Sequence, residues 1–218
     1  MNLGLTVVTH TSPKFNRDLK RCIESVRVAL PAGAKHIVIE HEGDFESFLV
    51  ARHNALKIDD VVVFVDDDDY ISEDSLRMCM DALNANDVGI AFTREIKVME
   101  DGRHKPRYRA TQLSQISDHP EIVHHMVAYR SKYISERSLD LAVQSGCGIE
   151  WTTRVDAAYA GGAIFVPMDG YYWVQHTEQN HRISDIQNRF KNNFIHMKEE
   201  MKKWMIEDKE IPVWTGIV

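Results

Sequence analysis

Short β-branched runs alternate with helix-forming segments in the first half of the chain, and this order restricts the fold more than any other feature. The expected strands are LGLTVVT (3–9), AKHIVIEH (34–41), DVVVFV (60–65) and VGIAFT (88–93). Segments 16–30 and 45–58 carry apolar residues at helical spacing, and Ser72 followed by two acids predicts a helix from there to about Asn84. Strands separated by helices predict βαβ units, and therefore an α/β fold with a mostly parallel central sheet flanked by helices.

The second half of the chain is less regular. Segment 94–110 resembles a hairpin around Asp101-Gly102. The other elements expected there are strands at 121–129, 163–167 and 170–175, helices at 131–143 and 149–160, and a long helix to about 209 that opens with Ser184 and Gln187 as a capping box. We see no repeat, low-complexity tract or linker, so residues 1–218 are expected to form one domain, with a regular half over 1–100 and an irregular half over 101–218.

The composition is that of a soluble globular protein. Hydrophobic residues make up 44% of the 218 and charged residues 27%, and no apolar run approaches the roughly 18 residues of a membrane span. The N-terminus lacks the basic segment of a signal peptide, so we expect a cytoplasmic protein. Three scattered cysteines, Cys22, Cys79 and Cys147, favour reduced thiols over a disulfide or zinc framework. A net charge of −7 repels anionic ligands, so a phosphorylated ligand needs local basic groups or a bound cation.

Four aspartates, Asp66 to Asp69, directly follow the apolar run at 60–65. Ligands of parallel α/β sheets bind just beyond the carboxyl ends of strands. If the chain stays extended, Asp66 and Asp68 project to one side and the other two to the opposite side. Carboxylates about 5 Å apart repel by about 3 kcal/mol at an effective dielectric near 20. A cation would remove this cost, and Mg²⁺ and Mn²⁺ prefer carboxylate oxygens. The run therefore predicts a Mn²⁺ or Mg²⁺ site.

The aspartate run could instead be a solvated turn in which Asp69 caps the following helix. An EF-hand loop is excluded because no glycine stands at the sixth position. A phosphatase-type nucleophile is disfavoured because Tyr70 occupies the place where such motifs carry a small hydroxyl residue.

The order of these features resembles the GT-A nucleotide-sugar glycosyltransferases, and the inverting family 2 in particular. The matching stretches are LTVVTHTS with LKRCIESV, IVIEHEGD, ARHNALKIDDVVVFVDDDDYISEDSL with its DxD motif, and GIEWTTRVDAAYAGGAIFVPMDGYYWVQH. The resemblance is strong over residues 3–84 and looser over 145–180. It implies a GT-A fold whose first half binds the nucleotide sugar and whose second half, with the C-terminal helix, binds the acceptor.

The activity implied by the resemblance is metal-dependent transfer of a hexosyl or pentosyl group from a nucleotide sugar, expected to be a UDP-sugar, to an acceptor hydroxyl. The expected ligands of Mn²⁺ or Mg²⁺ are Asp66, Asp68 and His176. The expected donor-binding residues are Thr9, His10, Thr11, Glu40, Arg52, Asn54, Asp66 and Asp67. His53 is an alternative to Arg52 for the arginine of the family.

The family also carries an acidic pair that supplies the catalytic base, and here Cys147 and Gly148 replace it. Glu150 aligns with the second acid and is the expected base, with Trp151 as a platform on which a sugar stacks. Glu150 could instead only begin a helix, where an acid is favoured by about 0.3 to 1 kcal/mol. Arg154, four residues on, would then simply pair with it.

The most basic segment lies in the second half. It contains Arg94, Lys97, Arg103, Lys105, Arg107 and Arg109, with Tyr108 among them. It could be a solvated hairpin, or it could contact the acceptor through Arg107 and Arg109. The acceptor would be a saccharide or, since phosphate contacts supply most affinity for DNA, a hydroxymethylated pyrimidine in phage-type DNA. His119, His124 and His125 do not form an obvious metal site, because adjacent strand residues face opposite sides.

Two other functional classes stay open. A nucleotidyltransferase or phosphohydrolase could use the same acidic site, although no glycine-rich phosphate loop follows the first strand. The replaced acidic pair also fits a catalytically inactive binding module of GT-A form. The apolar stripe of the C-terminal helix is expected to pack on the domain or on the second subunit of a homodimer; its residues are Phe190, Phe194, Met197, Met201, Trp204 and Met205.

Overall fold

The computed structural model describes residues 3–14, 17–107, 123, 125–176 and 184–207. Its strands are β1 Leu5–Thr11, β2 Lys35–Glu40, β3 Val61–Phe64, β4 Tyr70–Ile71, β5 Ile90–Val98, β6 His104–Pro106, β7 Val127–Arg130 and β8 Ala163–Val174. Its helices are α1 Leu19–Ala29, α2 Phe45–Ala55, α3 Ser75–Ala85, the 3₁₀ turn η1 Ser131–Tyr133, α5 Glu136–Ser145, α6 Ile149–Gly161 and α7 Ser184–Glu207.

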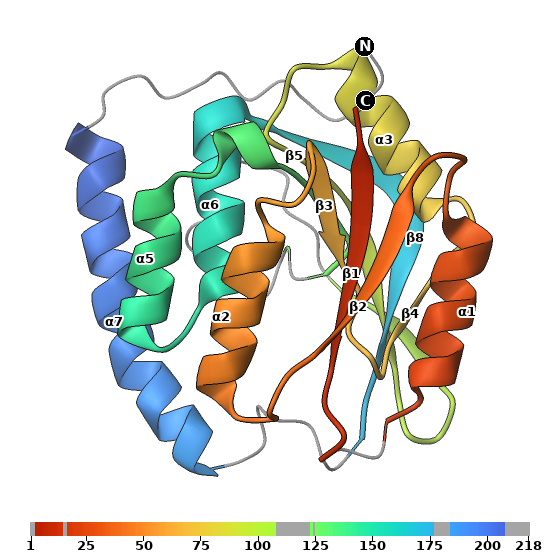
Figure 1. The fold of residues 1–218 in the computed structure, drawn as a ribbon, viewed down its shortest axis with the longest axis horizontal. Coiled ribbons are helices and arrows are strands. Elements are labelled where there is room, and N and C mark those ends of the chain that lie inside the picture. The colour runs from red at the N-terminus through yellow and green to blue at the C-terminus, as the bar shows by residue number, and fades with distance from the viewer. Residues whose placement is uncertain (1–2, 15–16, 108–122, 124, 177–183, 208–218) are drawn as a thin grey trace.

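The strands form one sheet in the order β2-β1-β3-β7-β5-β8-β4, with β6 paired to β5. The β1–β2, β1–β3 and β5–β8 pairs are parallel, and β7 runs antiparallel between β3 and β5. Helices α1 and α3 cover one face of the sheet, and α2, α5, α6 and α7 cover the other (Figure 1). The expected α/β fold with a mostly parallel sheet is therefore confirmed.

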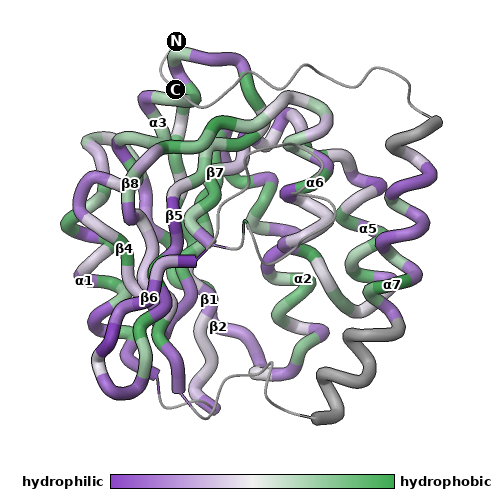
Figure 2. Tube along the Cα trace, turned by 180° about the vertical axis from the view of Figure 1, so that it is seen from behind, coloured by the Kyte–Doolittle hydropathy of each residue, from purple (hydrophilic) through white to green (hydrophobic). Residues whose placement is uncertain are grey.

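Both faces of the central strands are buried, which explains why β3 is apolar throughout and why β1 carries Val7 and Val8 on opposite faces. On β1, Val7 packs toward α1 and α3, whereas Val8 packs toward α2 and α6. Helix α7 adds Met197 and Met201 to the second of these cores. The apolar stripe of α7 thus packs on the domain itself, as far as its described side chains show. Figure 2 shows the same two helical layers from behind, with apolar segments concentrated in the interior.

Several boundaries differ from the sequence-based expectation. Tyr70 and Ile71 pair with β8, so the chain is still bonded to the sheet at Ser72, and α3 begins only at Ser75 with Asp74 at its N-cap. The two strands expected at 163–167 and 170–175 are one strand, β8, whose pairing with β5 shifts register around Arg94. The strand expected at 121–129 is described only as β7.

Two further expectations, the hairpin and the buried thiols, are confirmed. Antiparallel strands β5 and β6 form the hairpin around Asp101-Gly102, and Gly102 has the positive φ that such a turn favours. Cys22, Cys79 and Cys147 are free and buried, as expected for reduced thiols. Within the described residues, no helix is both long enough and apolar enough to cross a membrane.

Candidate active site

The four aspartates form a tight turn beyond β3, closed by a hydrogen bond of 3.1 Å from the Asp69 N–H to the Asp66 carbonyl. The chain is therefore not extended here, and the expected projection of Asp66 and Asp68 to one side is wrong. Each carboxylate instead has its own surroundings. The turn lies at the edge of the sheet where parallel strands β1, β2 and β3 end, which is the usual ligand site of such sheets.

Asp67 points into the protein. It is 1% exposed, and its two oxygens accept bonds from Arg17 Nη1 at 2.6 Å and from Thr11 Oγ1 at 2.8 Å. Burial raises the pKa of the Asp67 carboxyl, while the bonds from Arg17 and Thr11 oppose that rise. The expectation that Asp67 contacts the donor is corrected accordingly, since the side chain orders the loop after β1 instead of facing a ligand.

Asp68 lies beside the histidine that the family resemblance assigns to a metal site. Its Oδ2 atom is 2.6 Å from His176 Nε2 and 3.9 Å from Arg17 Nη1. Arg21 Nη2 donates to the Asp68 carbonyl at 2.8 Å. The structure thus brings residues 68 and 176 together across 108 positions of sequence, and it adds two arginines that the sequence pattern did not indicate.

Asp69 is fully buried, which excludes the alternative that it caps the next helix. Its oxygens accept bonds from the Tyr171 hydroxyl and from the Val174 N–H, both at 2.8 Å. Burial and the neighbouring carboxylates Asp68 and Asp66 raise the pKa of Asp69 well above its usual value. A carboxyl placed in this way serves the structure of the turn.

Arg52 connects the aspartate turn to helix α6. Its side chain is 3% exposed; Nη1 lies 2.5 Å from Glu150 Oε1, and Nη2 lies 3.5 Å from Asp66 Oδ1. The guanidinium also lies over the rings of Phe48 and Phe64, at 5.0 and 4.3 Å from their centroids. One buried cation therefore holds both the expected base and the first aspartate of the turn.

Glu150 stands in the first turn of α6, and its side chain is 28% exposed. Gly148 precedes the helix with φ +70°, and a Cβ at this position would lie 2.3 Å from the Met197 side chain. Because the Met197 side chain is flexible, it is chiefly the positive φ that favours glycine over an acid at position 148. Arg154 lies fully buried one turn on from Glu150, and burial lowers its pKa while Tyr129 and Glu150 oppose that fall.

The expected donor-binding residues divide into two groups. Thr11 and Glu40 are register partners at the ends of β1 and β2, and Glu40 is exposed. Thr9 is fully buried and bonds His36 Nε2 at 3.0 Å. Its assignment to the donor site is therefore corrected to a structural role.

His10 is also buried, between the rings of Phe48 and Phe64. Burial, followed by the charge of Arg52, lowers the pKa of the His10 ring to about 3. The ring is thus neutral in the folded protein and is not presented as a cationic contact to a diphosphate.

The depressed pKa of His10 predicts a loss of stability in acid. Between pH 6.5 and about 3 the unfolded chain takes up a proton that folded His10 refuses, so the free energy of unfolding falls as pH falls. Comparing urea unfolding at pH 7 and pH 5, we expect wild type to lose about 2 kcal/mol more than His10→Phe. An equal loss in both proteins would contradict this assignment.

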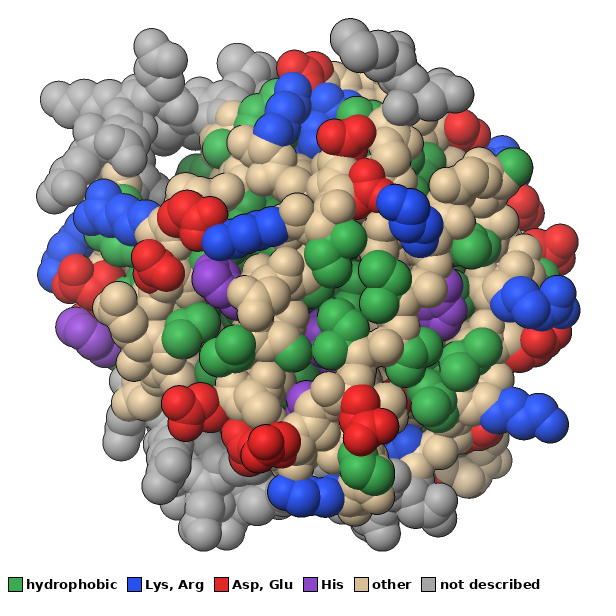
Figure 3. Space-filling view, viewed as in Figure 1, with side chains coloured by type: hydrophobic (Ala, Val, Ile, Leu, Met, Phe, Trp, Pro, Cys, Tyr) green, Lys and Arg blue, Asp and Glu red, His purple; other side chains and the backbone are tan. Residues whose placement is uncertain are grey.

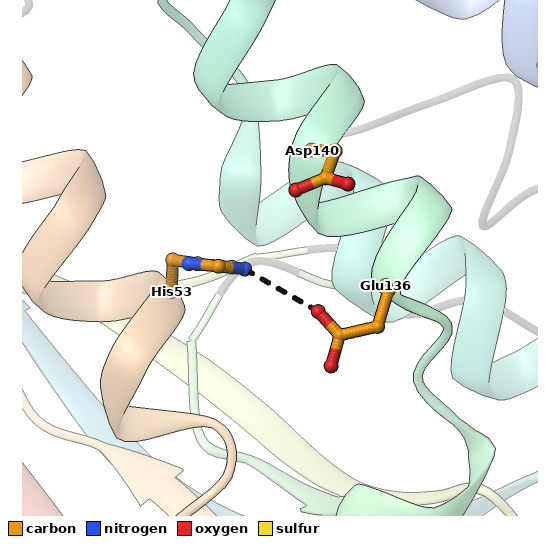
Figure 4. A group of neighbouring side chains, drawn as sticks. All are labelled: His53, Glu136 and Asp140. Atoms are coloured by element: carbon orange, nitrogen blue, oxygen red, sulfur yellow. Dashed lines mark ion pairs between the residues drawn. The ribbon is translucent and has the colours of Figure 1, made fainter.

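On α2, three successive residues face different directions because each residue turns a helix by about 100°. Arg52 faces the site, and Asn54 is exposed without a described contact to the turn. His53 faces α5 instead, where its Nε2 atom lies 3.8 Å from Glu136 Oε2 (Figure 4). Of the two candidates for the arginine of the family, the structure therefore favours Arg52, and it does not bring Asn54 to the site.

His53, Glu136 and Asp140 form a second group of metal-ligand type (Figure 4). Glu136 and Asp140 are exposed, and Lys57 Nζ already lies 2.6 Å from Glu136 Oε2. Glu136 is thus engaged at the surface by His53 and Lys57, and we assign no metal to this group.

Of the residues expected to contact the acceptor, Trp151 does not lie where the sequence led us to expect. Trp151 is 2% exposed and packs edge-on against Phe194 of α7. It cannot serve as a platform for a sugar, because α6 is buried on almost every side. Arg107 lies over the ring of Trp173 at 4.8 Å and bonds Glu95 at 2.9 Å. Arg109 lies outside the described residues, as do His119 and His124.

The ligand atoms of Asp68 and His176 fit a small divalent cation. In octahedral Mg²⁺ or Mn²⁺ sites with bonds of about 2.1 Å, neighbouring ligand atoms lie roughly 3 Å apart. Asp68 Oδ2 and His176 Nε2 are 2.6 Å apart, so a slight separation would place both on one ion. Asp66 and Asp69 of the turn also lie near His125, which precedes β7, with one ligand atom of each residue within 4.8 Å of the others, but both oxygens of Asp69 already accept hydrogen bonds.

Comparisons with known proteins agree with the fold. No family model and no curated protein matches the chain. Solved structures that match include TarS of S. aureus, residues 1–349, with 15% identity, a TM-score of 0.56, and coverage of 78% of this chain and 60% of that one. The complex of that fragment with UDP-GlcNAc matches with 14% identity, a TM-score of 0.53, and coverage of 80% and 59%.

A longer TarS structure matches with 13% identity and a TM-score of 0.60, covering 90% of this chain and 38% of that one. This chain therefore spans less than two thirds of the length of these TarS structures. At such identities the likeness shows the fold alone. The chain thus shares its mixed α/β fold, a sheet flanked by helices, with TarS.

Proposed function

We propose that the protein is a metal-dependent glycosyltransferase that moves a sugar from a nucleotide sugar to an acceptor hydroxyl. The observation that carries the proposal is the aspartate turn at the carboxyl ends of β1 and β3, joined through Arg52 to Glu150. The fold shared with TarS, which has been solved with UDP-GlcNAc, supports a UDP-sugar as the donor.

Asp68 and His176 are the proposed ligands of Mn²⁺ or Mg²⁺, with Asp66 close by. When bound, the cation would supply positive charge for the donor diphosphate and the leaving nucleotide. Arg17 and Arg21 flank the same turn, and we propose that they add to this charge near the phosphates. Thr11 and Glu40, at the ends of adjacent parallel strands, are the proposed contacts for the nucleoside.

Glu150 is the proposed general base. Its carboxylate would take the proton of the acceptor hydroxyl as that oxygen attacks the sugar carbon, while the bond from the sugar to the diphosphate breaks. Arg52 keeps the carboxylate at a fixed place beside the turn. Trp173 is half-buried, and Lys97 and Arg107 lie over its ring. We place the acceptor there, in place of the buried Trp151.

A saccharide is favoured over DNA as the acceptor. In the described basic segment, Arg94 pairs with Asp169, Arg103 with Asp101, and Arg107 with Glu95. On the one face of the molecule that Figure 3 shows, basic and acidic side chains are also interspersed. These pairs leave less positive charge for phosphates than the sequence alone indicates.

DNA binding gives a direct check on this choice. Lys97 and Lys105 face each other across the hairpin strands. For a saccharide acceptor, wild type and Lys97→Gln/Lys105→Gln should show equally weak binding to duplex DNA at low salt. The result that favours DNA as the acceptor is a loss of affinity in the variant, together with a slope of log K against log salt that is about two units shallower than that of wild type. Arg77→Gln on α3 is the control for a general loss of charge.

The donor is tested by thermal unfolding with UDP-, GDP- and TDP-sugars, each with Mn²⁺ and with EDTA. We expect Mn²⁺-dependent stabilisation by UDP-sugars together with slow hydrolysis of the donor. Stabilisation without turnover, even with acceptor saccharides, would favour an inactive binding module. Cleavage of nucleoside triphosphates would favour a nucleotidyltransferase or phosphohydrolase.

A further inference from the structure

Strand β8 is bonded to both ends of the aspartate turn through one buried hydroxyl. Tyr171 is fully buried, and its Oη accepts the Asp66 N–H at 3.1 Å and donates to Asp69 Oδ2 at 2.8 Å. Three residues after Tyr171, the Val174 N–H donates to Asp69 Oδ1 at 2.8 Å. The first and last residues of the turn are thus fastened to the strand that also leads to His176.

The tyrosine ring is itself held in place. It stacks on His125, with 4.7 Å between the ring centroids and an interplanar angle of 10°. His125 Nδ1 in turn lies 3.8 Å from Asp66 Oδ2. The histidine ring and the tyrosine hydroxyl therefore both approach Asp66, whereas Asp67 and Asp68 contact Arg17 and His176.

The partners of Asp69 indicate a geometric role. Its two oxygens accept from a hydroxyl and a backbone N–H, neither of which carries a charge, although the side chain is fully buried. Burying a carboxylate is costly unless its hydrogen bonds are satisfied. No ion pair of Asp69 is seen among the described residues. We therefore infer that its hydrogen bonds hold the backbone conformation of the turn and that its charge does not balance a neighbouring cation.

We propose that Tyr171, acting with Asp69, is a positioning residue that sets the geometry of Asp66 and Asp68 for the cation and diphosphate. The identity of the bound ligand in this inference rests on the proposed function. The hydrogen bonds of Tyr171 and Asp69 are observed independently of it. Metal ligands must be held close to their productive geometry by bonds that lie outside the ligand set. Of the four consecutive aspartates, Asp67 and Asp69 would then stabilise the structure, and Asp66 and Asp68 would bind the ligand.

The test compares two adjacent tyrosines. Tyr171→Phe removes only the bridging hydroxyl. Tyr172→Phe is the matched control, because Tyr172 stacks on Tyr70 and its hydroxyl makes no hydrogen bond within the described residues. For each protein we would measure the affinity for Mn²⁺ alone, the hydrogen exchange of the Asp66 amide without metal, and the folded fraction by circular dichroism.

In the folded Tyr171→Phe protein, Mn²⁺ affinity should fall about tenfold, as expected for the loss of a hydrogen bond that positions metal ligands from outside the ligand set. The Asp66 amide should also exchange faster. Asp69→Asn should behave similarly, and the double variant should bind Mn²⁺ no more weakly than Tyr171→Phe, because the two residues act as one unit. Tyr172→Phe should match wild type.

Wild-type Mn²⁺ affinity in a folded Tyr171→Phe protein would overturn the proposal, as would an equal loss in Tyr172→Phe. If the wild-type chain binds no Mn²⁺, the proposed metal site fails instead. Exchange of the Asp66 amide then decides the positioning role, and an unchanged rate in Tyr171→Phe would refute it.

Discussion

Asp68→Asn is expected to lower kcat/KM for sugar transfer by about a thousandfold, equivalent to about 4 kcal/mol of transition-state stabilisation. Asparagine keeps the size of the side chain and one oxygen, but it removes the charge that would hold the cation beside His176. The same variant should bind Mn²⁺ much more weakly. Both quantities are to be measured on protein whose folded state has been verified.

The control for Asp68→Asn is Asp81→Asn, which removes an exposed carboxylate on α3 that pairs with Arg77 and not with the turn. We expect the control to transfer sugar as wild type does. If Asp68→Asn retains metal-dependent turnover of a nucleotide sugar, the assignment of the metal site is wrong.

Glu150→Gln is expected to lower kcat by about a thousandfold, within the range for loss of a general base. Donor affinity should change little, since glutamine can still accept a bond from Arg52 while it can no longer take a proton. A fall in kcat at constant donor affinity separates a base from a residue that only begins a helix. The measurement is steady-state transfer with a parallel titration of the UDP-sugar.

Glu46→Gln is the matched control for Glu150→Gln, because Glu46 is an acid in the first turn of α2. Both substitutions remove a charge from a helix N-terminus, but Glu150→Gln should cost more stability than Glu46→Gln, because it also leaves the buried Arg52 without one of its ion-pair partners. Normal transfer by Glu150→Gln would remove it as the base and leave Arg52 with a purely structural partner.

The regular half of the fold was predictable because its signals are local. Apolar runs such as 60–65 form buried strands wherever helices cover both faces, and a charged run after such a strand must lie at its end. Position alone therefore located the aspartate site. The boundary of α3 was not predictable in this way, since it depends on the pairing of Tyr70 with Tyr172, far along the chain.

The positions of the side chains within the site depend on contacts between residues far apart in the sequence, which local sequence patterns do not predict. The extended geometry expected for the aspartates fails because Tyr171 and Val174, about a hundred residues away, bond Asp69. Arg17 and Tyr171 lie in segments whose sequence shows nothing unusual. Trp151 was misplaced because α6 is buried on nearly all sides, so its sequence lacks the polar face that would mark an exposed position.

The most direct test of the proposed function is hydrolysis of a UDP-sugar by the wild-type protein, followed as free sugar released with Mn²⁺ and with EDTA. We predict slow release with Mn²⁺, none with EDTA, and none for Asp68→Asn under either condition. Equal release with Mn²⁺ and EDTA, or a failure of every nucleotide sugar to bind, would contradict a metal-dependent glycosyltransferase.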